Sequence, residues 1–424
     1  MYRAGAASIV ITPTEPMWLA GFAVRTKPSN GTLADLKAKA LAIWDEHGEP
    51  FVIVTMDLIA ISRDIATSVA REVETKHKLP RARLLFGVSH THYGPEVRPD
   101  KAPFFHIPPE YAKKIAPLAE SLKAKLVALI GDALKDLRPA RLFARQGSAG
   151  FAHNRRANVD PIDHDVPVLE VTDPEGKRRA IVFGYACHNT TIPPEDGRFC
   201  GDWAGFAQQH VEAENPGAVA MFLTGAAADQ NPVPRGSIDL SRQYGRELAD
   251  AVTGALKGEA REIHGPIVAA MEEVPLDFQP LPSREKLEAD AAADDVPSRT
   301  KARFLLDSLG SGLPTSHPCP VQVIRLGSEM LLLALGGEVV VDYSVKFKSR
   351  FATPPDQPGP LVWVAAYCND MFGYVPTVRV QREGGYEGGR AMLWSALPMP
   401  FTETVEPRLT DAVERLVKRT GSSE

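Results

Sequence analysis

Residues 83–95 read Arg83-Leu84-Leu85-Phe86-Gly87-Val88-Ser89-His90-Thr91-His92-Tyr93-Gly94-Pro95, an apolar run that ends in two histidines. Side chains two residues apart in a β-strand point to the same face, so both imidazoles are expected to emerge together where the strand meets a loop. Strand ends of this kind are where many binding and catalytic sites are built. The stretch therefore predicts a buried strand that delivers His90 and His92 to a metal site.

A second histidine follows another apolar run. The segment Gly184-Tyr185-Ala186-Cys187-His188-Asn189-Thr190-Thr191 comes directly after the strand-like residues 180–183. Zinc in a hydrolase usually takes three protein ligands from His, Glu or Asp and leaves one position for water. His90, His92 and His188 qualify by type and place, and two strand-end sites suggest one shared catalytic centre. The alternative for each is a buried histidine that is hydrogen-bonded to the backbone.

A candidate carboxylate lies in Leu335-Gly336-Gly337-Glu338-Val339-Val340-Val341, a single acid within an apolar run. Burying a lone carboxylate is costly unless a cation or metal accompanies it. Glu338 is therefore a candidate metal ligand, and the alternative is a solvated acid at a hairpin.

Several other polar residues follow strands or precede helices. Asp202 comes just before a helical segment, where a carboxylate can also act as an N-cap. Asp229 and Asn231 end a turn of small residues that lets the backbone approach a ligand, or they merely hold that turn. Asp57 closes a strand and is a candidate for orienting a ligand histidine. Arg155 suits an oxyanion or carboxylate, but a surface arginine would have the same sequence pattern.

Other chemistries are weakened by what the sequence lacks. It contains no G-x-S-x-G elbow, no P-loop and no G-x-G-x-x-G after a strand, which argues against serine hydrolases and nucleotide-dependent enzymes. Cys187 precedes His188 directly, and neighbouring strand residues point to opposite faces, so a thiol–imidazole pair is not expected. The four cysteines are widely spaced without a C-x-x-C pair and are expected to be reduced and structural.

Composition indicates a globular protein. The 424 residues are 44% hydrophobic and 24% charged, and the formal net charge is -5. No dense Lys/Arg block is present, so nucleic acid is not an expected partner. The sequence shows neither a leader nor an apolar run of about 18 residues, so we expect no transmembrane segment and a cytoplasmic location.

Strand-like and helix-like patterns alternate past residue 250, which favours an α/β fold in which helices cover a sheet. Expected strands cover 38–44, 50–56, 84–88, 167–171, 180–185 and 218–223, and expected helices cover 62–77, 109–137, 205–214 and 240–256. A helical stretch at 279–311, a hairpin of 321–326 with 329–335 and a C-terminal helix at 403–418 complete the pattern. Without a repeat or linker, one domain is expected.

Taken together, these segments resemble the neutral/alkaline non-lysosomal ceramidase family, zinc amidases that cleave the N-acyl bond of ceramide. The resemblance runs in order through 4–13, 20–22, 55–58, 89–95, 154–155, 186–191, 201–205, 225–232, 336–343 (Gly336-Gly337-Glu338), 373–377 (Gly373-Tyr374-Val375) and 385–387 (Gly385-Tyr386-Glu387). It implies an α/β fold with a mixed β-sheet core covered by helices, like the ceramidase catalytic domain. It also implies one domain over 1–424, in which 1–265 supplies the histidines and 266–424 the Glu and Tyr ligands.

The resemblance also implies a mechanism. Bound Zn²⁺ would be held by His90, His188, Glu338 and Tyr374, and it would acidify a water and polarise the scissile carbonyl. His92, Arg155 and Tyr386 would line the reaction centre and stabilise the oxyanion. Asp202 and Asn231 are further catalytic candidates, from the motifs that contain them.

Two departures from the family shape the expected substrate. A serine proposed as important in ceramidases is replaced by Asn231, which favours a zinc-water scheme over a serine nucleophile. Characterised ceramidases also carry a C-terminal immunoglobulin-like domain, for which this shorter sequence has no room. We therefore expect a small soluble amide or ester as substrate, with sugar- and polyol-derived compounds among the candidates. A homo-oligomer is a candidate assembly.

Two alternatives remain open. A metal-dependent glycoside hydrolase or lyase on the same centre would surround the pocket with acids, for which Asp160, Asp163, Asp165, Asp202 and Asp229 are candidates. A non-catalytic binding relative would hold zinc weakly or not at all.

Overall fold

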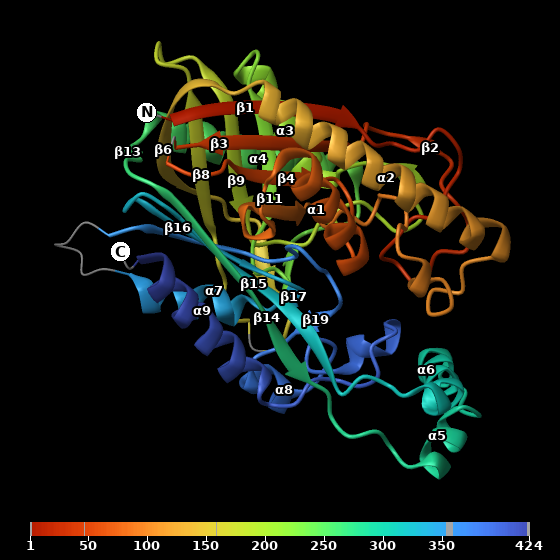
Figure 1. The fold of residues 1–424 in the computed structure, drawn as a ribbon. Helices are drawn as coiled ribbons and strands as arrows, with labels where there is room; N and C mark the ends of the chain where they lie inside the picture. Colours follow the sequence, from red (N-terminus) through yellow and green to blue (C-terminus); the bar gives the residue numbers. More distant parts are fainter. Residues whose placement is uncertain (1, 46, 158, 353–358, 422–424) are drawn as a thin grey trace.

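The computed structural model describes residues 2–45, 47–157, 159–352 and 359–421 (Figure 1). Within these residues the largest sheet has nine strands in the order β11-β9-β8-β6-β1-β3-β4-β5, with β13 beside β6. Its strands are β1 (Tyr2–Val10), β3 (Lys37–Trp44), β4 (Phe51–Met56), β5 (Leu84–Val88), β6 (Arg138–Ser148), β8 (Asp165–Thr172), β9 (Arg178–Tyr185), β11 (Val219–Thr224) and β13 (Arg261–Glu262). The pairs β4–β5 and β9–β11 are parallel and the others are antiparallel, so the sheet is mixed.

This sheet is strongly curved, because β11 at one end contacts β4 and β5 at the other. Gly87 of β5 allows this approach, since a Cβ atom there would lie 2.3 Å from Leu223 of β11. Alternate residues of the two halves fill the space between them, including Leu41, Ile53 and Val182. The curvature therefore brings the ends of β5 and β9, from which the candidate histidine segments emerge, to one place with the end of β11.

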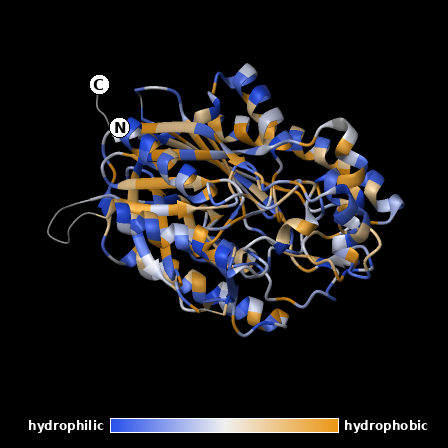
Figure 2. Ribbon diagram, turned by 90° about the horizontal axis from the view of Figure 1, so that it is seen from below, coloured by the Kyte–Doolittle hydropathy of each residue, from blue (hydrophilic) through white to orange (hydrophobic). Residues whose placement is uncertain are grey.

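Helices cover the outer faces of the curved sheet. The helices α1 (Arg63–His77) and α2 (Pro109–Lys135) pack on the half formed by β1, β3, β4 and β5, and α3 (Asp202–Glu214) and α4 (Ile238–Lys257) pack on the other half. Figure 2 shows that the strands are mostly hydrophobic, whereas the helices combine hydrophobic and hydrophilic residues. This is the pattern of helices that bury one face against a sheet.

A second sheet has the order β14-β15-β16-β18. Its strands are β14 (Ile267–Asp277), β15 (Ser316–Leu326), β16 (Met330–Leu335) and β18 (Leu361–Ala365). Ile324, Leu332 and Trp363 on one face join the inner core of the first sheet. The other face is covered by α7 (Val341–Phe351) and α9 (Val405–Gly421), below the second sheet in Figure 1.

Short elements connect these layers. The two-stranded pairs are β2 (Gly31–Thr32) with β10 (Arg198–Phe199), β7 (Ala152–Asn154) with β12 (Gln230–Pro232), and β17 (Glu338–Val339) with β19 (Tyr374–Val375). The remaining helices are α5 (Arg284–Asp290), α6 (Val296–Ser308) and α8 (Val378–Glu383), and the 3₁₀ turns are η1 (Arg81–Arg83), η2 (Pro99–Lys101), η3 (Leu309–Ser311) and η4 (Arg390–Trp394).

The predicted α/β class and most predicted elements are confirmed. The helix predicted to extend to residue 137 ends at Lys135, and β6 begins at Arg138. The strands β6, β14 and β18 were not predicted. In β6 only the small or apolar residues Ala140, Leu142 and Ala144 are buried, and the half-buried Phe143 on the opposite face obscures the alternation.

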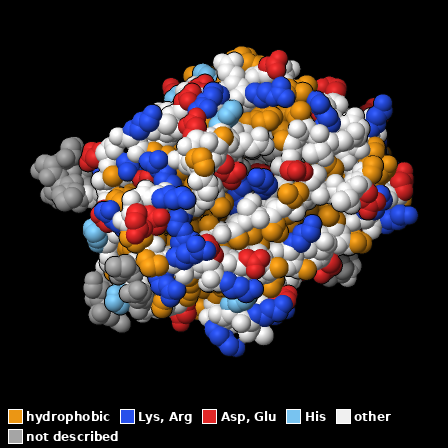
Figure 3. Space-filling model, turned by 90° about the horizontal axis from the view of Figure 1, so that it is seen from above, with side chains coloured by type: hydrophobic (Ala, Val, Ile, Leu, Met, Phe, Trp, Pro, Cys, Tyr) orange, Lys and Arg blue, Asp and Glu red, His pale blue; other side chains and the backbone are white. Residues whose placement is uncertain are grey.

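Three further observations concern the cysteines, the helices and the surface. All four cysteines are free and buried. No helix among the described residues is long and apolar enough to cross a membrane. On the face shown in Figure 3, basic and acidic side chains are interspersed rather than gathered by sign.

Candidate metal centre and pocket

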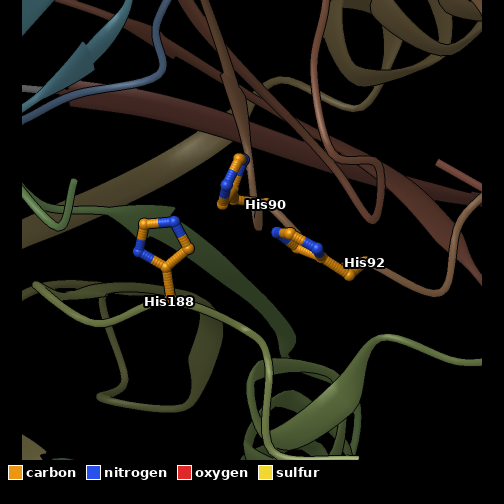
Figure 4. A group of neighbouring side chains, drawn as sticks. All are labelled: His90, His92 and His188. Atoms are coloured by element: carbon orange, nitrogen blue, oxygen red, sulfur yellow. The ribbon is translucent and has the colours of Figure 1, made fainter. Parts of the chain in front are cut away.

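Three histidine rings from two segments surround one small space (Figure 4). The ring centroids are 5.1 Å apart for His90 and His92, 4.8 Å for His90 and His188, and 6.0 Å for His92 and His188. One ligand nitrogen from each ring can be chosen so that all three lie within 4.8 Å of one another. The structure therefore brings the three predicted histidines together.

The local geometry differs from the expected strand alternation. The strand β5 ends at Val88. His90 then has a φ of 58°, in the left-handed region that residues other than glycine rarely adopt. Thr91 then pairs with Asn189 in a parallel bridge, which ties the two histidine segments to each other. The imidazoles converge because of this turn and bridge, and not because they alternate along a strand.

Backbone carbonyls orient two of the rings. His90 Nδ1 lies 2.7 Å from the carbonyl oxygen of Ile59, and His188 Nδ1 lies 2.7 Å from that of Ala227. Each ring therefore carries its proton on Nδ1 and turns Nε2 toward the shared space, the arrangement that ligand histidines normally show. Asp57, expected to do this, instead accepts hydrogen bonds from Lys37 N and Gln208 Nε2.

Glu338 completes the group from the second half of the chain. The parallel pair of β17 and β19 sets Glu338 beside Tyr374, and Glu338 N donates to Gly373 O at 2.7 Å. Its Oε2 lies 3.4 Å from His90 Nε2 and 3.5 Å from His188 Nε2. Glu338 is only 7% exposed, so it is not the solvated acid of the alternative interpretation.

The donor atoms fit a zinc ion. His90 Nε2, His188 Nε2 and Glu338 Oε2 are buried and have no hydrogen-bond partner among the described residues. Buried polar atoms are normally paired, so three unpaired atoms that face one another have the arrangement expected of metal ligands. Two imidazoles and one carboxylate are a donor set that zinc commonly takes.

The protonation states agree with this fit. Burial and the nearby Arg155 lower the pKa of His188 to about 4. Burial and the other two imidazoles hold the pKa of His92 well below its ordinary value. Burial favours the neutral carboxyl of Glu338, but His90 and His188 outweigh it and hold its pKa well below the usual range. Neutral imidazoles and a carboxylate are the forms that bind a metal.

Tyr374 and Tyr386 lie at the edge of this group, with ring centroids 5.2 Å apart. The Tyr374 hydroxyl accepts a hydrogen bond from Arg155 Nη2 at 3.1 Å, and burial holds its pKa well above the ordinary value. Tyr386 is 42% exposed, and burial with the charge of Glu338 raises its pKa to about 12. Both phenols are therefore protonated at neutral pH unless a metal ion lies beside them.

Arg155 is fixed by three neighbours and is not a surface arginine. Its Nε donates to Glu387 at 2.7 Å and its Nη1 to Asn231 Oδ1 at 3.3 Å, besides the bond to Tyr374. Burial disfavours its charge, but Tyr374 and Glu387 outweigh this effect and raise its pKa. Arg156 also pairs with Glu387, at 2.9 Å. The predicted residues Arg155, Asn231 and Tyr374 are thus brought together.

Asp202 has a supporting position. Its Oδ2 accepts a hydrogen bond from Thr191 N at 2.8 Å, and its Oδ1 accepts from Trp203 N and Ser241 Oγ. These bonds hold the segment that follows His188. Asp202 does not line the pocket described below, so its contacts are those of a residue that positions this segment.

The other acids that a glycosidase would use lie elsewhere. Asp163 and Asp165 each pair with Lys348 at 2.7 Å, and Asp160 is exposed. Asp229 accepts a hydrogen bond from Val341 N at 2.8 Å. The glycoside hydrolase alternative predicted that several acids surround the pocket. None of these acids lines the pocket that contains Glu338, so that prediction is not met.

A pocket with a cavity volume of about 70 Å³ opens onto the candidate metal centre. His90, His92, Glu338, Tyr374 and Tyr386 form one part of its wall. The loop 93–110 carries the apolar residues Phe104, Phe105 and Ile107, of which only Phe105 lines the pocket. Phe104 packs on Phe304 and Ile107 on a separate cluster with Trp18 and Ile115.

Sequence reasoning missed four residues of this region: Tyr367, Arg98, Lys101 and Glu387. The Tyr367 ring lies 4.4 Å from that of His90, and its buried hydroxyl has no partner among the described residues. Arg98 and Lys101 line the pocket from the loop 93–110. The sequence signal that could have found Arg98 and Lys101 is their charge among the prolines and aromatic residues of that loop.

The sequence matches no family model, and no curated protein matches it. Two solved structures are similar to the fold. Neutral ceramidase from Pseudomonas aeruginosa is 20% identical with a TM-score of 0.75, over 98% of this chain and 75% of that chain. A structure described as ceramidase complexed with C2 is 18% identical with a TM-score of 0.77, over 100% of this chain and 76% of that chain. The chain therefore has a ceramidase-like fold.

Proposed function

We propose that this protein is a zinc-dependent hydrolase that cleaves an amide or ester bond with a metal-activated water. The observation that carries the proposal is the convergence of three unpartnered ligand atoms, His90 Nε2, His188 Nε2 and Glu338 Oε2, next to an open pocket. The similarity of the fold to ceramidases, which are hydrolases, supports the same reaction class. Tyr374 is the proposed fourth ligand, because it adjoins Glu338 in the β17–β19 pair.

Zinc, when bound, would supply a Lewis acid and lower the pKa of a water molecule. The guanidinium of Arg155 is held by Glu387 and Asn231, so it is ready to stabilise an oxyanion near Tyr374 without reorganising. Tyr386, at the exposed edge of the pocket, can donate its hydroxyl proton to the same oxygen. His92 is neutral and both its nitrogens lack partners, so it can accept a proton within the pocket.

A substrate screen tests the reaction class. Purified protein would be treated with a chelator, reloaded with zinc and assayed on small amides, esters and glycosides. We expect amide or ester hydrolysis that disappears on chelation, returns with zinc and is absent in His90→Ala. His47→Ala, at an exposed histidine, is the matched control and should retain activity. Cleavage of glycosides alone, or activity that survives in His90→Ala, would contradict the proposal.

A further inference from the structure

Lys101 lies at the end of η2 and is only 7% exposed, yet it lines the same pocket as His92 and Glu338. Among the described residues, no hydrogen bond or ion pair of its ammonium group is found, whereas the neighbouring basic groups have partners. A buried ammonium without a partner carries a desolvation penalty that folding alone does not repay. Lys101 therefore has the properties of a group that waits for a ligand.

The charges around Lys101 leave its own charge uncompensated. Arg98 binds Glu96 through two hydrogen bonds of 2.8 and 2.9 Å, so that pair is nearly neutral. Asp100 is exposed and forms no ion pair with Lys101. Lys301 donates to the carbonyl oxygens of Ser395 and Leu397. Among the described residues that line this pocket, Lys101 is thus the positively charged side chain without a partner.

The lysine remains mostly protonated at neutral pH. Burial and the neighbouring Arg98 lower its pKa to about 8, but Asp100, Glu96 and Glu338 act in the opposite direction. A single ammonium matches a singly charged anion such as a carboxylate. The same ammonium disfavours the binding of an uncharged alkyl chain, because the chain would bury the ammonium further without pairing it.

The rest of the wall is apolar. Phe105 and Trp394 pack with ring centroids 5.7 Å apart, and Phe372 and Met371 line the pocket beside them. A compact apolar or aromatic group would fit against these side chains. The pocket therefore combines a hydrolytic centre, a free cation and an aromatic surface.

We propose that the substrates are small amides that carry a carboxylate close to the scissile bond, of the N-acyl amino acid type, and that Lys101 binds this carboxylate. The proposal rests on the proposed hydrolase function and adds the substrate class to it. Lys101 is then the residue that determines specificity for anionic substrates, and it takes no part in bond cleavage.

The test compares N-benzoylglycine with N-benzoylglycinamide, which differ in the negative charge. Benzoate release gives kcat/KM, and calorimetry gives the affinity of each compound for wild type, Lys101→Met and Lys101→Arg. We expect wild type to prefer the carboxylate, and Lys101→Met to lose about 10- to 100-fold with that compound only, as for a hydrogen bond between charged groups. Lys101→Arg should recover most of the loss, and Lys113→Met, at an exposed lysine, should resemble wild type.

Thermal unfolding separates this role from a structural one. Removing an unpaired buried charge should leave the Tm of Lys101→Met unchanged or higher, whereas a structural lysine would lower it. If neither compound is cleaved but carboxylate-selective binding is lost in Lys101→Met, Lys101 is the carboxylate-binding residue but the assignment of these amides as substrates is overturned. If wild type does not bind the carboxylate more tightly, or if Lys101→Met weakens both compounds equally, this proposal is overturned while hydrolysis can remain.

Discussion

At the scale of single residues, the metal centre depends on small neighbours as well as on its ligands. Gly21 has a φ of 99°, and a Cβ atom there would lie 2.3 Å from His92 Nδ1. The absence of a side chain lets the His92 ring pack between this segment and Phe22, whose ring centroid is 4.6 Å away. The position of His92 is thus fixed by a residue that makes no polar contact with it.

We expect Gly21→Ala to destabilise the protein by about 3 kcal/mol, because the left-handed backbone and the overlap with His92 both cost free energy. Gly176→Ala is the matched control, since its φ is 89° but nothing lies within 4 Å of the added Cβ. That change should cost only about 1 kcal/mol for the backbone. Denaturant unfolding measures both, and equal losses in the two variants would show that the contact with His92 is not tight.

At this scale the sequence predicted several residues that the structure brings together. His90, His188 and Glu338 were predicted from residue types at strand ends and from the cost of burying a lone acid. Tyr374 was predicted as a ligand only through the resemblance, since nothing in residues 373–377 marks a phenol as a ligand. Lys101 and Tyr367 were not found, because their importance depends on burial without a partner, which no sequence pattern expresses.

At the scale of elements, the pairing of β17 with β19 and the start of α7 hold Glu338 in place. Val341 N, at the first residue of α7, donates to Asp229 Oδ1 at 2.8 Å. Asp229 in turn lies between Ala227, whose carbonyl orients His188, and the strand β12. One carboxylate therefore connects the histidine side of the centre to the Glu338 side.

We expect Asp229→Ala to weaken zinc binding about 10- to 100-fold, because it removes support from both sides without removing a ligand. Asp229→Asn keeps an oxygen that can accept from Val341 N and should lose much less. Competition with a fluorescent zinc chelator gives both affinities. Wild-type affinity in Asp229→Ala would mean that α7 holds Glu338 without this bond.

Element prediction succeeded where apolar runs are continuous and failed where they are not. The buried strands β4, β5 and β9 were predicted from their composition. The strand β6 was missed because it buries only Ala140, Leu142 and Ala144, with Phe143 on the opposite face. The strand β14 was missed because buried and half-buried positions mix along it. Their pairing comes from tertiary contacts, to which strand formation is sensitive.

At the scale of the whole molecule, the centre joins the two sheets. The histidines follow strands of the first sheet, whereas Glu338 follows β16 of the second and Tyr374 pairs beside it. The sequence predicted the α/β class, but not the curvature that brings β11 to β5 or the packing of one sheet on the other. Both depend on contacts between residues far apart in the chain.

A zinc ion bound by residues that follow strands of both sheets should stabilise the whole molecule. We expect chelation to lower the free energy of unfolding by about 4 kcal/mol when zinc was present at about 1,000 times its Kd. Thermal unfolding with and without chelator measures this, and His90→Ala should show no difference between the two conditions. A chelator effect of the same size in His90→Ala would place the metal elsewhere.

The most direct test of the account is the metal content of the purified protein by elemental mass spectrometry, with His90→Ala, His188→Ala and Glu338→Ala prepared in parallel. Glu288→Ala, at an exposed acid, is the control. We expect about one zinc per chain in wild type and control, as a single zinc site requires, and its loss in the three variants. Protein without zinc that also fails to take it up on reconstitution, or variants that keep it, would contradict the central claim.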